Sequence, residues 1–346
     1  MKKKTVMRIA AMCAASVLGM SALGGCGDSG QGEAKTSSKN TGADSGSGQK
    51  SDGDYVYRVG FVNIDNADNC CYPAMQKFVE YVESDDFAKS VGADSVEVLT
   101  ADSAKDIEKQ TTNVETLLSK GVDMMFIIGV DTAGNTTAVQ ACNEENVPVF
   151  MVGTEASGGE WKFIGFEEKQ LGEMQGEWCA ENLPENANIC YLEGTAGREA
   201  TTLRKEGFEE GISSRDDLNI ISSQTGDFET ATAMQVTEDW IQTYGDEIDC
   251  IVSADGKMMV GAVEALKGAN MLDAVTTVGV VSVEDDGYLI KGGEQDYAVF
   301  VSWPSIGTLC GEIAEKVYKG ETVEDRTNIE MQHMTQDNYE ELIATL

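Results

Sequence analysis

Short β-rich runs recur along the chain and alternate with segments of helical periodicity. Near-continuous apolar strands separated by helices are typical of parallel sheets whose two faces are both covered. The pattern therefore predicts strands at 57–64, 95–101, 122–130, 147–153, 188–194, 219–226, 248–255, 276–283 and 297–303.

Helical spacing is clearest for Ile107, Val114 and Leu117. Ser103 precedes them as a predicted N-cap, and Gly121 follows them and ends the predicted helix. Six more helices are expected at 134–145, 170–182, 198–212, 230–244, 257–268 and 305–319.

The length of 346 residues favours two domains. The first four predicted strands form one βαβα series, and the series restarts after Trp161. A right-handed crossover in each unit gives an α/β fold of two doubly wound parallel-sheet lobes with a cleft between them. Ligands bind such sheets beyond the carboxyl ends of their strands.

The N-terminus has the pattern of an export signal. Lys2, Lys3, Lys4 and Arg8 precede an apolar stretch at 9–23. The following 23–26 segment, Leu-Gly-Gly-Cys, resembles a bacterial lipobox, so we expect a signal peptide at 1–25 and lipid attachment at Cys26. An ordinary secretory signal with an incidental cysteine is the alternative. Glycines and serines dominate the next segment, which predicts a lipid-attached flexible linker at 26–54.

The charge is strongly acidic, with 25 Lys+Arg against 60 Asp+Glu and a formal net charge of −35. Removing residues 1–25, which carry four basic residues and no acid, makes the net charge −39. This field argues against nucleic acid as a partner. Only one histidine is present, His333, which disfavours triads and zinc sites.

Seven cysteines follow position 26, so they cannot all pair. Cys190 and Cys250 lie in apolar runs and are interpreted as core thiols. We predict no cofactor, because the segment 129–136 lacks the lysine of a phosphate loop and no GxGxxG motif follows a predicted strand. We also predict no metal site, because the acidic segment from Asp65 lacks the glycine and the glutamate of a calcium loop.

An ordered set of segments spans 57–335. It includes Gly121-Val122-Asp123 before a strand, Phe163-Ile164-Gly165, a 192–197 segment with Arg204 downstream, and Val278-Gly279-Val280. Together they resemble the periplasmic sugar-binding proteins of the ribose/galactose-binding type, which serve ABC importers. The resemblance implies a three-crossing hinge, with crossings near 155–163, 301–304 and 331–335. The implied lobes are 55–158 plus 304–332, and 159–303 plus 333–346.

The resemblance also implies ligand contacts. Asn69 would donate to a hydroxyl and Tyr72 would stack on a ring, while Phe228 and Arg204 fall close to a family aromatic and arginine. The usual Asp-Arg pair is replaced by Gly153 and Thr154. The implied set is Asn69, Tyr72, Thr154, Glu155, Arg204, Phe228, Asp255 and Trp303.

Each of four residues also has a structural alternative. Trp303 packs the hinge in that interpretation, Phe228 belongs to the core, Arg204 forms a salt bridge with its own helix, and Asp255 caps the helix that begins at Lys257.

The sequence thus predicts a non-enzymatic, monomeric solute-binding lipoprotein of an ABC importer, outside the cytoplasm, with a sugar or sugar-like ligand and the importer's permease as partners. One alternative is a receptor of the same fold that signals to a membrane protein. A less favoured alternative is a lipoprotein hydrolase that uses a carboxylate pair.

Overall fold

The apolar runs form two six-stranded sheets in the computed structural model, which describes residues 56–346. The first sheet has the order β11-β5-β4-β3-β1-β2, and all its pairings are parallel. The second has the order β12-β10-β9-β8-β6-β7, and β12 alone runs antiparallel to its neighbour. The strands are β1 (Val56–Asn63), β2 (Ser95–Asp102), β3 (Met124–Ile127), β4 (Val149–Val152), β5 (Lys162–Gly165), β6 (Asn188–Glu193), β7 (Asn219–Thr225), β8 (Cys250–Ser253), β9 (Thr276–Val281), β10 (Tyr297–Phe300), β11 (Arg326–Asn328) and β12 (Gln332–Met334).

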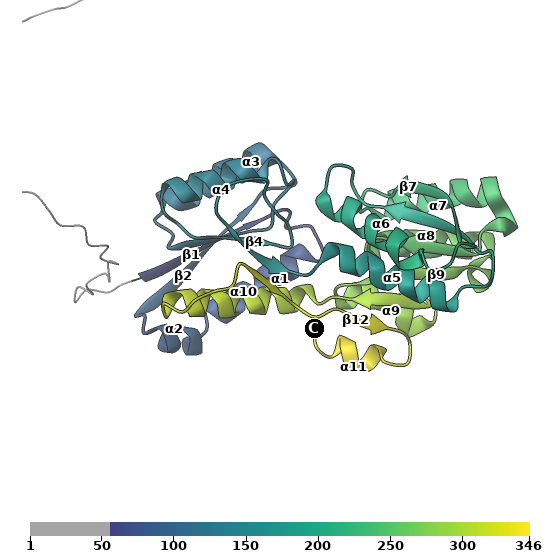
Figure 1. Ribbon diagram of the computed structural model, residues 1–346. Helices are drawn as coiled ribbons and strands as arrows, with labels where there is room; N and C mark the ends of the chain where they lie inside the picture. The colour runs from purple at the N-terminus through teal and green to yellow at the C-terminus, as the bar shows by residue number, and fades with distance from the viewer. Residues whose placement is uncertain (1–55) are drawn as a thin grey trace, which may run out of the picture. The chain divides into compact units, whose positions relative to one another are not determined.

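Helices connect the strands of each sheet (Figure 1). They are α1 (Cys71–Val82), α2 (Asp85–Val91), α3 (Ile107–Ser119), α4 (Asn135–Glu144), α5 (Glu168–Asn182), α6 (Glu199–Ile212), α7 (Thr230–Tyr244), α8 (Gly256–Ala269), α9 (Glu284–Gly292), α10 (Trp303–Tyr318) and α11 (Tyr339–Ile343), with short 3₁₀ turns at Gly245–Glu247 and Leu272–Ala274. The predicted fold class, two doubly wound parallel-sheet lobes, is confirmed.

The chain passes between the two sheets three times. It leaves the first sheet between β5 and α5, returns between β10 and α10, and leaves again between β11 and β12. In Figure 1, α10 lies beside α1, and the Tyr81 hydroxyl of α1 donates to Glu315 of α10 at 2.9 Å. The segment after the second crossing is therefore built into the first lobe.

The first crossing lies later than the sequence analysis placed it. Strand β5 pairs in parallel with β4 through Met151 and Phe163, so the first sheet extends past residue 158. A boundary at 158 and a crossing near 155–163 are therefore too early. Strand β5 is only four residues long, which is too short to be recognised from its hydrophobic pattern alone.

The start of α3 also differs from the prediction. Asp106, not Ser103, is the N-cap, and its carboxylate accepts from the amide of Lys109 at 2.9 Å. Ser103 is buried one turn earlier. Aspartate and serine are both favoured N-caps, so the sequence preference alone did not separate them.

An aromatic cluster forms the centre of the first lobe. Phe61 and Phe126 lie on neighbouring strands and Phe150 on the next, and Phe78 of α1 packs against the first two, with ring centroids 4.8–6.2 Å apart. All four side chains are buried. Aromatic rings contribute the largest apolar areas to a core, so α1 is held to the sheet by this cluster.

Helices α5 and α6 of the second lobe touch backbone to backbone. A Cβ at Gly172 would meet the carbonyl oxygen of Arg204, and a Cβ at Gly207 would meet that of Lys169. Glycine at both positions therefore permits an approach that a larger residue would block.

Gly207→Ala is accordingly expected to lower the melting temperature by about 5 °C, because overpacking of this kind costs about 1–3 kcal/mol. Scanning fluorimetry measures the shift. Gly268→Ala is the control, since a Cβ there meets nothing within 4 Å. Equal melting temperatures for the two variants would contradict the close helix contact.

The seven cysteines of the described region are free thiols, all buried except the half-buried Cys70. Burial raises the pKa of the Cys190 thiol to about 12. The interpretation of Cys190 and Cys250 as core thiols is confirmed. The predicted signal peptide, the lipid site at Cys26 and the linker lie outside the described residues. Within 56–346, no helix has the length and apolar character needed to cross a membrane.

Candidate functional site

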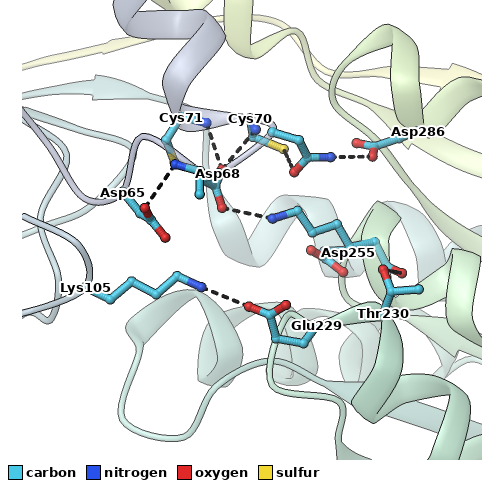
Figure 2. A network of polar contacts seen from close by, with 12 residues as sticks. Asp65, Asp68, Cys70, Cys71, Lys105, Glu229, Thr230, Asp255 and Asp286 are labelled. Atoms are coloured by element: carbon cyan, nitrogen blue, oxygen red, sulfur yellow. Dashed lines mark hydrogen bonds and ion pairs between the residues drawn. The ribbon is translucent and has the colours of Figure 1, made fainter. Parts of the chain in front are cut away.

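The loop between β1 and α1 contacts the second lobe through Asp68. One carboxylate oxygen of Asp68 accepts from the amides of Cys70 and Cys71, each at 2.9 Å, and the other accepts from the Lys257 ammonium of α8 at 3.1 Å (Figure 2). Burial opposes ionisation, but Lys257 and the two amides outweigh it and hold the pKa of Asp68 below its ordinary value. The carboxylate thus stays charged and links the lobes.

A second bond joins the same loop to α9. The Asn69 amide donates to the Asp286 carboxyl at 2.9 Å (Figure 2). Asp286 is only 3% exposed and lies in the first turn of α9. Burial, followed by the charge of Asp255, raises the pKa of Asp286 to about 7. Asn69 therefore reaches from the first lobe to the second, and its partner there is a protein carboxyl.

A third contact between the lobes is more exposed to solvent than the first two. The Lys105 ammonium donates to Glu229 at 2.9 Å, and both side chains are about half exposed. Exposed pairs of this kind contribute little to stability. The less exposed contacts between the lobes are those of the loop that carries Asp68 and Asn69.

Asp255 lies at the carboxyl end of β8 and caps α8. Its side chain accepts from the amide of Met258 at 2.9 Å, which confirms the alternative interpretation as a helix cap. Burial raises the pKa of Asp255, while the Met258 amide, Arg204 and Lys257 partly counteract that effect. Asp255 still lies near the contacts between the lobes, because its charge helps to raise the pKa of both Lys257 and Asp286.

Arg204 is buried and engaged by the protein. It donates to Glu168 and to the carbonyl oxygen of Ala254, both at 2.6 Å, and its guanidinium lies over the rings of Phe166 and Phe228. Burial alone would lower the pKa of Arg204, but Glu168 holds it above the ordinary value. The salt bridge runs from α6 to the first residue of α5, so the alternative of a salt bridge within its own helix is wrong. The bond to Ala254 connects Arg204 to the loop that carries Asp255.

Phe228 has a left-handed backbone, with φ of 54°. Its ring lies over Gly194, where a Cβ would collide with it, and Arg198 lies 5.2 Å from the ring centroid. Positive φ is uncommon for a bulky residue and concentrates at functional sites. The half-buried ring is held at the carboxyl ends of β6 and β7.

The other predicted residues lie nearer the crossings. Trp303 is 8% exposed and packs edge-on against Phe166, with centroids 6.1 Å apart, and against Gly153. Thr154 accepts from the Gly129 amide at 2.8 Å. Glu155 pairs with Arg326 at 2.6 Å.

A small cavity of about 50 Å³ lies beside the first crossing, lined in part by Thr154, Glu155, Arg198 and Arg326. Tyr72 is half-buried on α1 against the core. The structure thus places Asn69, Asp255 and Phe228 at or just after strand ends, with Arg204 in contact with Phe228 and with the residue before Asp255. Thr154, Glu155 and Trp303 lie beside the crossings.

Sequence reasoning missed three of the residues that join the lobes. Asp68 lies in the acidic segment that was considered only as a calcium loop, Lys257 was considered only as the start of a helix, and Asp286 was given no ligand role. Their shared signal was available, because each follows the carboxyl end of a predicted strand by a few residues. Among residues 56–346, no group of three His, Cys, Asp or Glu side chains is arranged to hold a metal ion.

Comparisons with known proteins agree with this architecture. A family model described as a periplasmic binding protein domain matches residues 59–322. The ribose import binding protein of Haemophilus influenzae is 29% identical over 235 residues, covering 68% of this chain and 79% of that protein. An ABC transporter solute-binding protein of Bacillus halodurans, solved with bound myo-inositol, is 27% identical with a TM-score of 0.71 and covers 86% of this chain and 100% of its own.

A sensory relative shares the fold alone. The fructose-binding periplasmic domain of a hybrid two-component system has a TM-score of 0.75 at 18% identity, over 84% of this chain and 94% of that domain. The family match, the two lobes and the three crossings agree, and the chain belongs to the periplasmic binding protein family, in the type I class of sugar-binding proteins.

Proposed function

We propose that this protein captures a sugar or sugar-like small molecule between its lobes, outside the cytoplasm, and presents it to the permease of an ABC importer. The observation that carries the proposal is the contact of loops from both lobes at the carboxyl ends of their sheets, through Asp68 with Lys257 and Asn69 with Asp286. In parallel α/β sheets, that edge is where ligands bind.

Hinge closure is the proposed mechanism. Three short crossings connect the lobes, so small backbone changes there can separate Asp68 from Lys257. A ligand that contacts both lobes stabilises the closed arrangement relative to the open one by its difference in affinity for the two. The closed surface is what the permease recognises.

The proposed ligand contacts come from both lobes. Asn69 and Tyr72 approach from the first, and Phe228 and Asp255 from the second. Trp303, Thr154 and Glu155 contribute at the crossings, and Arg204 acts by positioning Phe228 and the loop after β8. A rigid aromatic face such as that of Phe228 suits the apolar face of a sugar ring.

The named ligands of the relatives support this class. The Haemophilus influenzae relative is named for ribose, and the Bacillus halodurans structure holds myo-inositol. Both are polyhydroxylated rings. The relatives are binding proteins, which supports a role in capture without catalysis. A monomeric state is part of the proposal.

The proposal is tested by native mass spectrometry of the purified protein, followed by release and identification of any bound molecule. A sugar or polyol supports the proposal, and an amino acid or nucleoside contradicts the ligand class. A thermal-shift panel of sugars is the second measurement, because a ligand that binds only the folded state raises the melting temperature.

Lipid attachment at Cys26 is part of the proposal. Cys26→Ala is expected to move the protein from the membrane fraction to the medium or periplasm, because one acylated cysteine supplies the tether. Fractionation and immunoblotting measure the distribution, with Cys13→Ala as the control inside the proposed signal. Retention of Cys26→Ala in membranes would contradict lipid anchoring at this residue.

A sensory role is the second candidate, and the fructose-binding domain of a hybrid two-component system supports it by fold. Transport and sensing differ in their partner. Deleting the gene should abolish uptake of the identified ligand under the transport proposal, whereas normal uptake with a lost transcriptional response supports sensing.

A further inference from the structure

Asp286 is the only acidic side chain of residues 56–346 that is fully buried. Burying a carboxylate is costly unless a cation or several donors compensate it. No Lys or Arg in the described region forms a salt bridge with Asp286. Its side-chain partner is the neutral amide of Asn69, on the opposite lobe.

The surroundings of Asp286 favour a carboxyl group at this point. Its carboxyl lies against Gly256, where an added Cβ would come within 2.7 Å of Cγ. Gly256 thus leaves the space that the carboxyl occupies at the start of α8. The backbone of Ser282 also bonds to it.

A second carboxyl, Asp255, lies close by. Its charge is the main cause, after burial, that raises the pKa of Asp286 to about 7, so Asp286 is only partly ionised at neutral pH. The cations nearest this pair form their salt bridges with other acids, Lys257 with Asp68 and Arg204 with Glu168. Within residues 56–346 neither Asp255 nor Asp286 forms a salt bridge, although the charge of Lys257 partly offsets the raised pKa of both.

Opening of the lobes would part Asn69 from Asp286 and expose the carboxyl to whatever enters the cleft. A protonated amine offers both the donors that Asn69 supplies and a positive charge between Asp255 and Asp286. A hydroxyl offers a donor without the charge. Hydrogen bonds to charged groups are the stronger kind.

We infer that Asp286 is a ligand-binding, specificity-determining residue, and that with Asp255 it favours a sugar or polyol carrying a protonated amine over the neutral analogue. This inference rests on the proposed function. Asp286→Asn is the test variant because it keeps the size of the side chain and an acceptor for Asn69. Asp285→Asn is the matched control, since Asp285 is the exposed neighbour on the same turn.

The experiment is isothermal titration of the purified protein with matched pairs: glucose and glucosamine, galactose and galactosamine, mannose and mannosamine, and myo-inositol and an amino-inositol. In at least one pair the amine is expected to bind at least about 10-fold more tightly, the range for a hydrogen bond to a charged group. Asp286→Asn should reduce this preference to less than about threefold, while Asp285→Asn keeps it.

Equal or tighter binding of the neutral member in every pair that binds would overturn the inference and leave the proposed function intact. An amine preference that survives in Asp286→Asn would overturn the assignment to this residue. If none of the panel binds, the proposed sugar-binding function falls with the inference. Far-ultraviolet circular dichroism of both variants verifies that each is folded.

Discussion

Replacing Glu168 by alanine is expected to lower the melting temperature by about 10 °C. The Glu168 and Arg204 side chains are 11% and 9% exposed, so the substitution leaves a buried guanidinium without its carboxylate. Removing one partner of a buried pair costs about 3–5 kcal/mol, and each kcal/mol lowers the melting temperature of a protein of this size by about 2–4 °C.

Two further variants separate the buried pair from a general effect of charge. Glu167→Ala removes the adjacent carboxylate, which pairs with Arg326 where both are more than 40% exposed, and should cost less than about 1 kcal/mol. Adding Arg204→Met to Glu168→Ala should recover part of the loss, because the uncompensated charge is gone. Similar losses for Glu168→Ala and Glu167→Ala would show that the pair contributes no more than a surface bridge.

The Glu168–Arg204 pair also connects three parts of the second lobe. Glu168 is the first residue after the first crossing, and Arg204 reaches from it to the carbonyl oxygen of Ala254, directly before Asp255. Phe166 and Phe228 lie on the guanidinium. One side chain thus contacts the start of α5, the loop after β8 and the ring of Phe228 within the second lobe.

The strands were predictable because parallel strands covered on both faces carry continuous apolar runs. Strand β3, for example, is buried at all four positions. The elements that were missed lack that signal. Strands β11 and β12 have three residues each, and mostly exposed ones.

Helix α9 was missed because it has only nine residues and Gly287 interrupts it, although the three acids of its first turn suit a helix start. The glycine is required by tertiary packing, since a Cβ there would come within 2.8 Å of the Tyr339 ring of α11. Helix α1 begins with Cys71, Tyr72 and Pro73, and proline is tolerated in a first turn even though it breaks a helix interior.

The site was predictable only to the level of strand ends. The family resemblance proposed Asn69 and Asp255 as ligand contacts, and both lie at or just after the ends of predicted strands. It did not reveal that Asn69 bonds to Asp286, because the two lie 217 residues apart and no local pattern links them. Local patterns also left Arg204 open between ligand and salt bridge, and the distance to Glu168 decides that it forms the bridge.

Lys257→Met is expected to weaken ligand binding by about 30-fold, which corresponds to about 2 kcal/mol of lost closed-state stabilisation. The Lys257–Asp68 pair joins the lobes at 3.1 Å with both side chains about one-fifth exposed. In an open arrangement water solvates both charges, so the pair acts on closure. Methionine keeps the aliphatic stem and removes the charge.

A double-mutant cycle with Asp68→Asn isolates the pair, because asparagine retains an oxygen for the amides of Cys70 and Cys71. Isothermal titration with the ligand identified by mass spectrometry should give single-variant losses that do not add in the double variant. Lys105→Met is the control, since its pair with Glu229 is half exposed and its loss should change affinity less than about threefold. Additive losses, or equal effects of Lys257→Met and Lys105→Met, would contradict a specific role of the Lys257–Asp68 pair in closure.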